Sequence, residues 1–441
     1  MSEPEIDVVV VGAGIAGVTA ARDLSREGYS VVLLEARDRV GGRLYSTAGP
    51  NGVLELGGGY VHWTQPHIWR ELQRHELDHL TPPLESEEMY WFAQGKVHNG
   101  SFQDWMASAG PYIQQFFADA RTHFPQPYDN DVVQAATEID KQSISDRIAA
   151  LGQTDYGRDC VEGALGGLIC SAEKHGVAQL LMGSAITFGE YGFYLETAGQ
   201  WFLASGTKAL INAIQAESSA QLELNAPVKS ITESGANVTV KTQTGKVVTG
   251  KIVLVTVPLN TIGNIAIEPP LLPSVSRMIE LKNPTLSAKV WARVKGHIKP
   301  FSALAPPGSI ALNAVRVEKR CGSDTYVLCM CAQASMIPSD AEERRNVVEK
   351  GLRVFVPDIE VVDTATHDWV GDEFSQGAWM IHRPGQMTGA AHEIRKPHGR
   401  IFFAGGDIAA VNPGSIEGAM DSAASAARSI AKVLRSAKQC A

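Results

Sequence analysis

The sequence predicts an α/β protein in which one domain is assembled from three separate segments of the chain, with a second, α+β domain inserted between them. Three features predict this arrangement. A short apolar strand near the amino terminus runs into a glycine-rich turn and a helix, a buried strand occupies 252–257, and another strand at 400–404 precedes the last helix. Apolar runs of this length, bounded by glycine or proline, are typical of buried strands.

The amino-terminal motif is the most informative part of the chain. The apolar run Asp7–Val11 is followed by the glycine-rich stretch Gly12–Gly17 and then by a helical pattern. Gly12 allows a sharp turn, and Gly14 lets backbone N–H groups approach a pyrophosphate at the positive end of the helix. Gly17 lets that helix lie close to the sheet.

A second strand, Ser30–Leu34, ends in Glu35, where a carboxylate can accept a hydrogen bond from a ribose hydroxyl. A Gly-x-Gly-x-x-Gly pattern alone is weak, because glycines also mark ordinary turns. Here strand, turn, helix, second strand and terminal acid occur in the expected order. This combination predicts a Rossmann-type unit that binds an adenine dinucleotide.

The residues after Glu35 indicate which dinucleotide. The chain continues as Glu35-Ala36-Arg37-Asp38-Arg39-Val40-Gly41-Gly42-Arg43, and a second glycine-rich turn follows at Leu54–Tyr60. This resembles the FAD-binding fingerprint of the flavin amine oxidase family. Backbone without side chains at 41–42 and the charge of Arg43 suit a diphosphate. A glycine turn at 57–59 would let the chain pass along the edge of a flavin ring.

The resemblance covers nearly the whole chain and implies a division into five segments. We expect the FAD-binding domain to comprise residues 1–81, 206–284 and 391–441. Residues 82–205 form a mainly helical insertion, and 285–390 form a strand-rich part. These two would together build a substrate domain over the flavin.

The second and third FAD-domain segments have recognisable elements of their own. The second begins with a helix at 207–214 and continues through a strand near 228–231 and a hairpin, Val238–Val248, that turns at Thr244-Gly245. In the third, Gly399–Asp407 and Gly414–Ala419 look like two carboxyl-terminal segments of the family. A helix beginning at Ser415 would then direct its positive end at the flavin, and Asp407 would hold the ribityl chain or the diphosphate.

Two side chains are expected to act beside the flavin. Lys289, in a strand of alternating apolar residues, is similar to the family lysine that holds a water against flavin N5 and assists the reaction with oxygen. Trp379 ends a segment, 368–379, that resembles the one leading to an aromatic residue of the family's substrate cage. Outside these motifs, a strand lysine is more often solvated and a tryptophan more often belongs to the core.

The chain departs from the family pattern at two positions. The opposite cage wall is usually tyrosine or phenylalanine, whereas Ser415 occupies the matching position. This half-cage suggests a bulkier or more polar amine, or a hydrogen-bonding role for Ser415. Some members attach FAD through a cysteine just before the first cage aromatic, and this position is Ala378. We therefore expect FAD to be bound non-covalently.

Three further residues are candidates for substrate contact. His62, in Gly59-Tyr60-Val61-His62-Trp63, resembles a histidine that faces the substrate in related oxidases and could orient the amine or accept its proton. A buried histidine satisfied by the backbone is nearly as good an interpretation. Tyr60 is expected at the site, and Gln200 by a weaker similarity.

Motif and resemblance together assign the cofactor contacts. The residues are Gly12, Gly14, Ile15, Ala16, Gly17, Glu35, Ala36, Arg37, Gly42, Arg43, Gly57, Gly58, Gly59, Tyr60, Val228, Trp369, Gly406, Asp407, Ser415, Ile416 and Ala419.

Composition excludes several classes of protein. With 44% hydrophobic and 20% charged residues the chain is typical of globular proteins, and a net charge of −9 argues against a nucleic-acid partner. The six cysteines lack metal-binding spacing, so we expect buried reduced thiols and no metal. No signal peptide or apolar segment of the ~20 residues that span a bilayer is present, and we expect a cytoplasmic location without membrane contact. The sequence leaves open whether the chain forms a homodimer.

The resemblance implies an FAD-dependent amine oxidase. Hydride would pass from the α-carbon of a primary or secondary amine to flavin N5, and O2 would reoxidise the flavin to give H2O2. An L-amino-acid oxidase is an alternative, since Arg293, Arg316 or Arg383 could form a carboxylate clamp. An amine dehydrogenase with another electron acceptor is a second alternative. A non-catalytic binding protein of the same fold is a remote one, because the nucleotide fingerprint is intact.

Overall fold

Strand β1 (Ile6–Val11) lies inside an eight-stranded sheet, paired in parallel with β2 on one side and β12 on the other. The computed structural model describes residues 6–49 and 52–439, except for the side chains of 130–132, 438 and 439. Val8 and Val10 face one hydrophobic core, and Val9 and Val11 face another. The strand is apolar throughout because both of its faces are covered.

The eight strands come from the three predicted segments of the chain. Their order is β13-β10-β11-β12-β1-β2-β9, and β19 pairs with the last part of β12. The bounds are β2 (Val31–Leu34), β9 (Gln221–Glu223), β10 (Val228–Ser234), β11 (Asn237–Thr242), β12 (Val247–Val255), β13 (Ala266–Glu268) and β19 (Ile401–Phe403). The assembly of one Rossmann-type sheet from three segments, and the hairpin that turns at 244–245, are confirmed.

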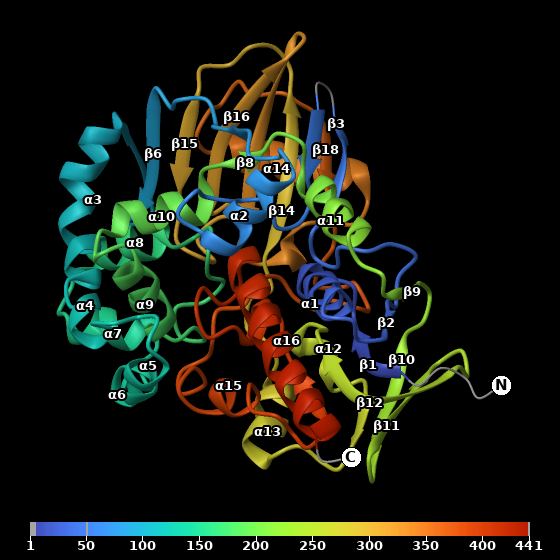
Figure 1. The fold of residues 1–441 in the computed structure, drawn as a ribbon. Helices are drawn as coiled ribbons and strands as arrows, with labels where there is room; N and C mark the ends of the chain where they lie inside the picture. Colours follow the sequence, from blue (N-terminus) through green and yellow to red (C-terminus); the bar gives the residue numbers. More distant parts are fainter. Residues whose placement is uncertain (1–5, 50–51, 440–441) are drawn as a thin grey trace.

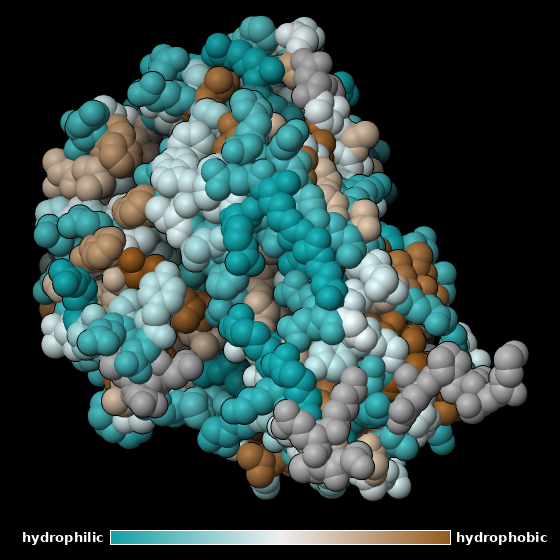
Figure 2. Space-filling view, in the orientation of Figure 1, coloured by the Kyte–Doolittle hydropathy of each residue, from teal (hydrophilic) through white to brown (hydrophobic). Residues whose placement is uncertain are grey.

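Helices cover both faces of this sheet (Figure 1). One face carries α1 (Ile15–Arg26), α11 (Thr207–Ala216) and α16 (Ile416–Gln439), and the other carries α12 (Leu259–Ile262), α13 (Pro273–Leu281) and α15 (Ala390–Glu393). Helix α16 buries residues at helical spacing, among them Met420, Ala423, Ala427 and Leu434. Its outer side belongs to the hydrophilic front face in Figure 2.

A second sheet of seven strands has the order β18-β14-β17-β16-β15-β6-β7. Its strands are β6 (Glu88–Ala93), β7 (Lys96–Gly100), β14 (Ala288–Val294), β15 (Phe301–Leu304), β16 (Ala314–Cys321), β17 (Asp324–Cys331) and β18 (Val361–Thr366). Helix α14 (Ala341–Arg353) packs against it. The segment predicted to be mainly helical therefore contributes two strands to this sheet.

The remaining helices, apart from α2 near the centre, lie largely on one side of the molecule, at the left of Figure 1. They are α2 (Pro66–Arg74), α3 (Phe102–Phe117), α4 (Ala120–His123), α5 (Asn130–Ala135), α6 (Thr137–Asp140), α7 (Ile144–Ala150), α8 (Asp155–Ala164), α9 (Ala178–Ile186) and α10 (Tyr191–Gly199). Two small ribbons complete the fold: β3 (Ser46–Gly49) with β4 (Gly52–Glu55), and β5 (Leu80–Thr81) with β8 (Phe202–Leu203). Within the described residues, no helix is both long and apolar enough to cross a bilayer.

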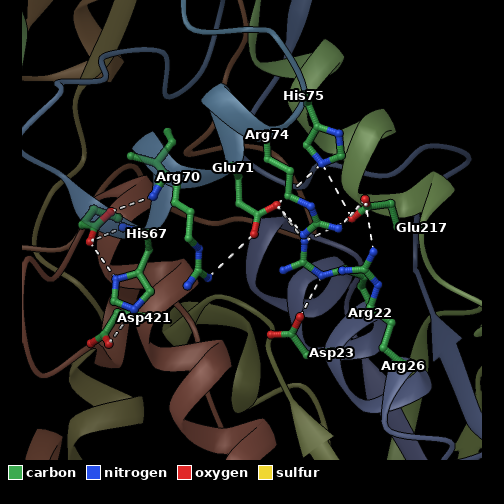
Figure 3. A network of polar contacts seen from close by, with 12 residues as sticks. Arg22, Asp23, Arg26, His67, Arg70, Glu71, Arg74, His75, Glu217 and Asp421 are labelled. Atoms are coloured by element: carbon green, nitrogen blue, oxygen red, sulfur yellow. Dashed lines mark hydrogen bonds and ion pairs between the residues drawn. The ribbon is translucent and has the colours of Figure 1, made fainter.

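A partly buried ion-pair network joins α1, α2 and the end of α11 (Figure 3). Arg22 donates to Glu71 at 2.8 Å and lies 3.4 Å from Glu217, and Arg74 contacts both carboxylates. Glu71, Glu217 and His75 also come close enough together to be metal ligands. Their carboxylates are already paired with guanidinium groups, which satisfy them and repel a further cation, so we interpret the cluster as structural.

The described cysteines are free thiols, as expected. Cys160, Cys329 and Cys331 are buried, and Cys170 and Cys321 are half-buried. Cys440 lies outside the described residues.

Candidate active site

A cavity of about 380 Å³ is lined by residues of both sheets and of helices α9 and α10. It brings together most of the predicted site residues. Those in its lining are Gly12, Gly14, Ile15, Ala16, Glu35, Ala36, Arg37, Gly42, Arg43, Gly57, Gly58, Gly59, Tyr60, Val228, Lys289, Trp369, Trp379, Gly406, Ser415, Ile416 and Ala419. Gly17, His62, Gln200 and Asp407 are not part of the lining.

The amino end of α1 is suited to a diphosphate. Gly14 is the N-cap, and no side chain caps the helix or places an acid in its first turn. A Cβ added to Gly14 would meet no atom within 4 Å, so the position faces open space in the cavity. Unpaired N–H groups and the helix dipole favour an anion at this point. The structure therefore fits the predicted dinucleotide at the first glycine turn.

Two further glycines permit close backbone approach. A Cβ on Gly17 would lie 1.8 Å from the carbonyl oxygen of Gly12. Any residue other than glycine at this position would therefore prevent the present packing of helix α1 against strand β1. Gly17 thus acts through packing, which is why it lies outside the cavity lining. Gly42 has φ +57°, and a Cβ there would lie 3.2 Å from the Cα of Gly14. This narrow approach keeps the second glycine loop beside the first.

Glu35 is buried at the end of β2 and lines the cavity. Its carboxylate accepts hydrogen bonds from the N–H groups of Ala13 at 2.7 Å and Arg37 at 2.9 Å. Two such bonds leave lone pairs on both oxygens for hydroxyl donors. The Arg37 guanidinium is engaged by Asp372 at 2.5 Å and by Ser375 at 2.9 Å, so it closes the wall without leaving a free charge.

Arg43 connects two distant parts of the chain. It donates to the Asp407 carboxylate at 2.6 Å and to the carbonyl oxygen of Ala378 at 2.5 Å. Asp407 also accepts the N–H of Leu259 at 2.9 Å. Asp407 is thus held by two protein donors outside the cavity lining, and Arg43 fixes the backbone next to Trp379.

The glycine turn at 57–59 is held by buried donors from β14 and from the loop that follows β18. The indole N–H of Trp369 donates to Leu56 at 2.9 Å, and Lys289 Nζ donates to the carbonyl oxygen of Gly57 at 2.5 Å. A Cβ on Gly57 would lie 1.9 Å from the carbonyl oxygen of Arg43 and 3.0 Å from the Trp369 ring. The turn therefore needs glycine for packing as well as for access to a flat ligand.

Lys289 is buried on β14 and not on a solvated strand face. Burial lowers the pKa of its amine to about 8, against the opposing effect of the carboxylates of Glu55 and Glu318. Its Nζ lies 5.3 Å from the centre of the Tyr60 ring, which stacks on Phe202. An ammonium held this way can stabilise negative charge that develops in the cavity.

Trp379 is fixed in the wall by a hydrogen bond from its indole N–H to the carbonyl oxygen of Leu168 at 2.8 Å. Ser415 also lines the cavity, but its hydroxyl is used by the helix it precedes. It donates to Asn412 at 2.7 Å and accepts the N–H of Gly418 at 3.0 Å. Ser415 therefore caps α16. Its hydroxyl proton is already donated to Asn412, so it is not available to donate to a substrate.

His62 and Gln200 do not reach the cavity. The His62 ring is fully buried, 2.7 Å from the Thr64 hydroxyl and 3.4 Å from Glu196, and the Trp63 ring lies 3.9 Å from it. Burial lowers the pKa of His62, so the ring stays neutral in its packed position. Gln200 is the C-cap of α10, two residues after the lining residue Ala198, and is itself outside the lining. Contact of these two side chains with the substrate stays a prediction.

Helices α9 and α10 supply lining residues that the sequence did not indicate. These are Gln179, Met182, Gly183, Ile186, Tyr194, Thr197 and Ala198. Their spacings of three and four residues place them on one face of each helix. Helix α9 is buried on almost every side, so its hydrophobic pattern does not distinguish the side facing a cavity from the side facing a core.

The three arginines proposed as a carboxylate clamp lie elsewhere. Arg316 pairs with Glu318 at 2.6 Å, and Arg293 lies 3.7 Å from Asp324. Arg383 donates to backbone carbonyls at the end of α13. None is in the cavity lining, where the arginines are Arg37 and Arg43, each paired with an aspartate.

Comparison with known proteins identifies the family. The profile of the flavin containing amine oxidoreductases matches residues 15–431. The chain belongs to this family. It is 31% identical to a nicotine dehydrogenase of Pseudomonas putida over 98% of this chain and 89% of that protein. It is 26% identical to (S)-6-hydroxynicotine oxidase of Paenarthrobacter nicotinovorans, over 96% and 99% of the two chains.

Solved structures agree on the fold. A triple variant of putrescine oxidase superimposes with a TM-score of 0.83 at 21% identity, over 98% of this chain and 99% of that one. The predictions of a flavin cofactor, an enzyme and a Rossmann-type fold are confirmed, and the protein is a flavin-dependent enzyme of amine oxidation. A role as a non-catalytic binding protein is not needed to explain any feature of the cavity.

Proposed function

We propose that the enzyme oxidises an amine with a neutral, apolar body, using non-covalently bound FAD, and passes the electrons to O2. One observation carries the substrate class. Leu168, Met182, Ile186 and Ile381 line the cavity and pack in one hydrophobic cluster with Trp379, and none of them is charged. A second ammonium group on the substrate would lose its hydration there without gaining a partner.

The charge of Lys289 also selects the protonation state of the substrate amine. When bound, FAD accepts a hydride equivalent from the carbon next to the substrate nitrogen. An ammonium in the same cavity repels a protonated amine, so the chain favours the neutral amine, which is also the form able to lose that hydride. Trp379 offers a rigid aromatic wall that orients the amine and excludes water. We propose that Tyr60 contacts the substrate through its ring. Ser415, whose hydroxyl caps α16, would make van der Waals contact only.

The binding of FAD rests on this chain's own residues. We propose that the amino end of α1 holds the diphosphate and that Glu35 accepts hydrogen bonds from the ribose. Val228 lines the cavity near Glu35 and would cover the adenine side. Ala378 has no atom able to form a thioether, which supports non-covalent attachment.

Relatives bear on the substrate and on the electron acceptor. Those named for nicotine and 6-hydroxynicotine act on amines that carry an aromatic ring, which supports an amine with a neutral body here. One of them is named a dehydrogenase and the other an oxidase. The buried ammonium of Lys289 favours O2 as the electron acceptor. The relative named nicotine dehydrogenase makes an amine dehydrogenase the second candidate.

A single assay separates these functions. The purified holoenzyme is mixed in air with apolar amines, polyamines and amino acids, and peroxide release is compared with reduction of an artificial acceptor. Peroxide release with apolar amines alone is the result expected. Turnover only with the artificial acceptor would favour the dehydrogenase, and turnover only with amino acids would contradict the proposed substrate class.

A further inference from the structure

The wall formed by α9 and α10 contains an unusually close helix–ring contact. Tyr194 of α10 lies against Gly183 of α9, and a Cβ added to Gly183 would fall 2.4 Å from Cε2 and 2.8 Å from Cζ of the tyrosine. Glycine inside a helix lowers helix stability by about 1 kcal/mol relative to alanine. Gly183 is explained by the space that the Tyr194 ring requires, so the ring has one defined position in the wall.

Tyr194 presents its hydroxyl to the cavity without a protein partner. The side chain lines the cavity, and within the described residues its hydroxyl makes no hydrogen bond. Nearby polar groups are engaged. Gln179 donates to Met380 and Pro413, and Thr197 donates to the carbonyl oxygen of Tyr194. The Trp379 indole N–H is used by Leu168.

The surroundings determine what this hydroxyl can bind. Burial raises the pKa of Tyr194, so the phenol keeps its proton and can donate. Its neighbours are apolar: Gly183 beneath the ring, Phe117 with ring centres 6.1 Å apart, and the side chains of Met182 and Ile186 in the same wall. A substrate that displaces water from this wall must supply an acceptor or leave the hydroxyl unpaired.

We propose that the Tyr194 hydroxyl donates a hydrogen bond to an acceptor heteroatom of the substrate, at a distance from the reacting nitrogen. The inference rests on the proposed function and narrows it. The substrate is then a neutral amine whose apolar body contains one acceptor, such as a ring nitrogen, an ether oxygen or a carbonyl oxygen. Tyr194 is a specificity-determining residue, and Gly183 is a positioning residue that acts through it.

The test compares substrates that differ by one acceptor atom. An arylalkylamine with a phenyl ring and its 2-, 3- and 4-pyridyl analogues are mixed anaerobically with the holoenzyme, and flavin bleaching gives the limiting rate of reduction and the apparent Kd of each. For at least one pyridyl isomer, Tyr194→Phe should lower the pyridyl-to-phenyl ratio of limiting rate over Kd about tenfold, since one neutral hydrogen bond is lost. The loss should appear in Kd and leave the limiting rate unchanged.

Two further variants keep the test specific. Tyr191→Phe removes a hydroxyl from the same helix that contacts Met106 at 3.8 Å and lies outside the cavity lining, and it should leave the ratio unchanged. Gly183→Ala should lower the ratio as Tyr194→Phe does, and combining the two changes should lower it no further. A merely structural disturbance would affect phenyl and pyridyl amines alike.

The possible failures are distinguishable. If the phenyl amine bleaches the flavin but Tyr194→Phe leaves all three pyridyl-to-phenyl ratios unchanged, the assignment of Tyr194 is wrong and the proposed function stands. If none of the four amines bleaches the flavin, the proposed function is contradicted together with the inference that rests on it.

Discussion

Lys289 on β14 donates a hydrogen bond of 2.5 Å to the carbonyl oxygen of Gly57, 232 residues earlier in the chain. The contact joins the second sheet to the glycine turn that leads out of the Rossmann-type domain. It also fixes a buried ammonium in the wall of the cavity. The two domains therefore share a site at the point where their backbones meet, and neither domain alone holds the charge in place.

Lys289→Met should slow the reaction of the reduced enzyme with oxygen far more than anaerobic reduction by the amine. The lost electrostatic contribution is on the order of 2–4 kcal/mol, which corresponds to a rate lower by about one hundred- to one thousand-fold. Stopped-flow absorbance separates the two half-reactions. Lys319→Met is a matched control, because Lys319 is a half-buried lysine of β16 outside the cavity lining. A parental oxygen rate in Lys289→Met would exclude this role.

The oxygen half-reaction should also depend on pH through Lys289. Burial lowers the pKa of this amine to about 8, so the ammonium is present below that pH and is lost as the pH rises through it. The rate of reaction with oxygen should fall above about pH 8 in the parent enzyme and should show no such step in Lys289→Met. A step of equal size in both proteins would assign the titration to another group.

Gly14→Val and Gly17→Val should separate cofactor binding from folding. A side chain on Gly14 projects into open cavity space, so the polypeptide should fold but lose flavin. A side chain on Gly17 collides with the Gly12 carbonyl at 1.8 Å and should destabilise the domain itself. Flavin content per folded chain and thermal unfolding measure the two effects. Normal flavin content in Gly14→Val would show that the diphosphate does not bind at this turn.

FAD should leave the protein when the chain is denatured by acid or heat. Ala378 offers no sulfur for a thioether, and its carbonyl oxygen is fixed by Arg43 at 2.5 Å. After precipitation of the polypeptide, the yellow colour and the fluorescence should be found in the supernatant. Flavin that stays with the precipitate would reveal a covalent bond at another residue.

Trp379→Ala should impair reduction by the amine and leave the reaction with oxygen nearly unchanged. The indole is fixed by Leu168, so its loss removes a positioned wall and admits water. A fall of ten- to one hundred-fold, about 1.4–2.7 kcal/mol, is expected in the limiting rate of reduction. Trp379→Phe should recover part of it. Equal losses in both half-reactions would point to a disturbed fold.

The sequence predicted the parts of this structure that depend on local order. Strand, glycine turn and helix around Gly14 need only neighbouring residues, and the apolar strand at 252–257 has few alternatives to burial. Tyr194 and Gly183 could not be predicted as a pair, because their contact arises only when α10 folds against α9. The environment of His62 depends on such a contact too, because Glu196, 3.4 Å from its ring, comes from α10, whereas Trp63 is its neighbour in the sequence.

The strand-rich half of the substrate domain shows a second limit. Strands β6 and β7 join the sheet of β14 to β18 from a segment otherwise made of helices. The two strands pair with each other in a local hairpin, but the place of β6 in the sheet depends on its pairing with β15, some two hundred residues later. Sequence pattern identifies such strands poorly, because register depends on the partner as much as on the strand.

Matched pairs of amine and amino acid test the proposed substrate class most directly. Anaerobic stopped-flow bleaching of the flavin is compared within pairs that differ by one carboxylate, such as 2-phenylethylamine with phenylalanine, for several sizes of side chain. The apolar lining around Trp379 and the absence of an arginine clamp among the described lining residues predict that the amine reacts at least about one hundred-fold faster in each reactive pair. Amino acids that bleach the flavin as fast as their amines would contradict the account.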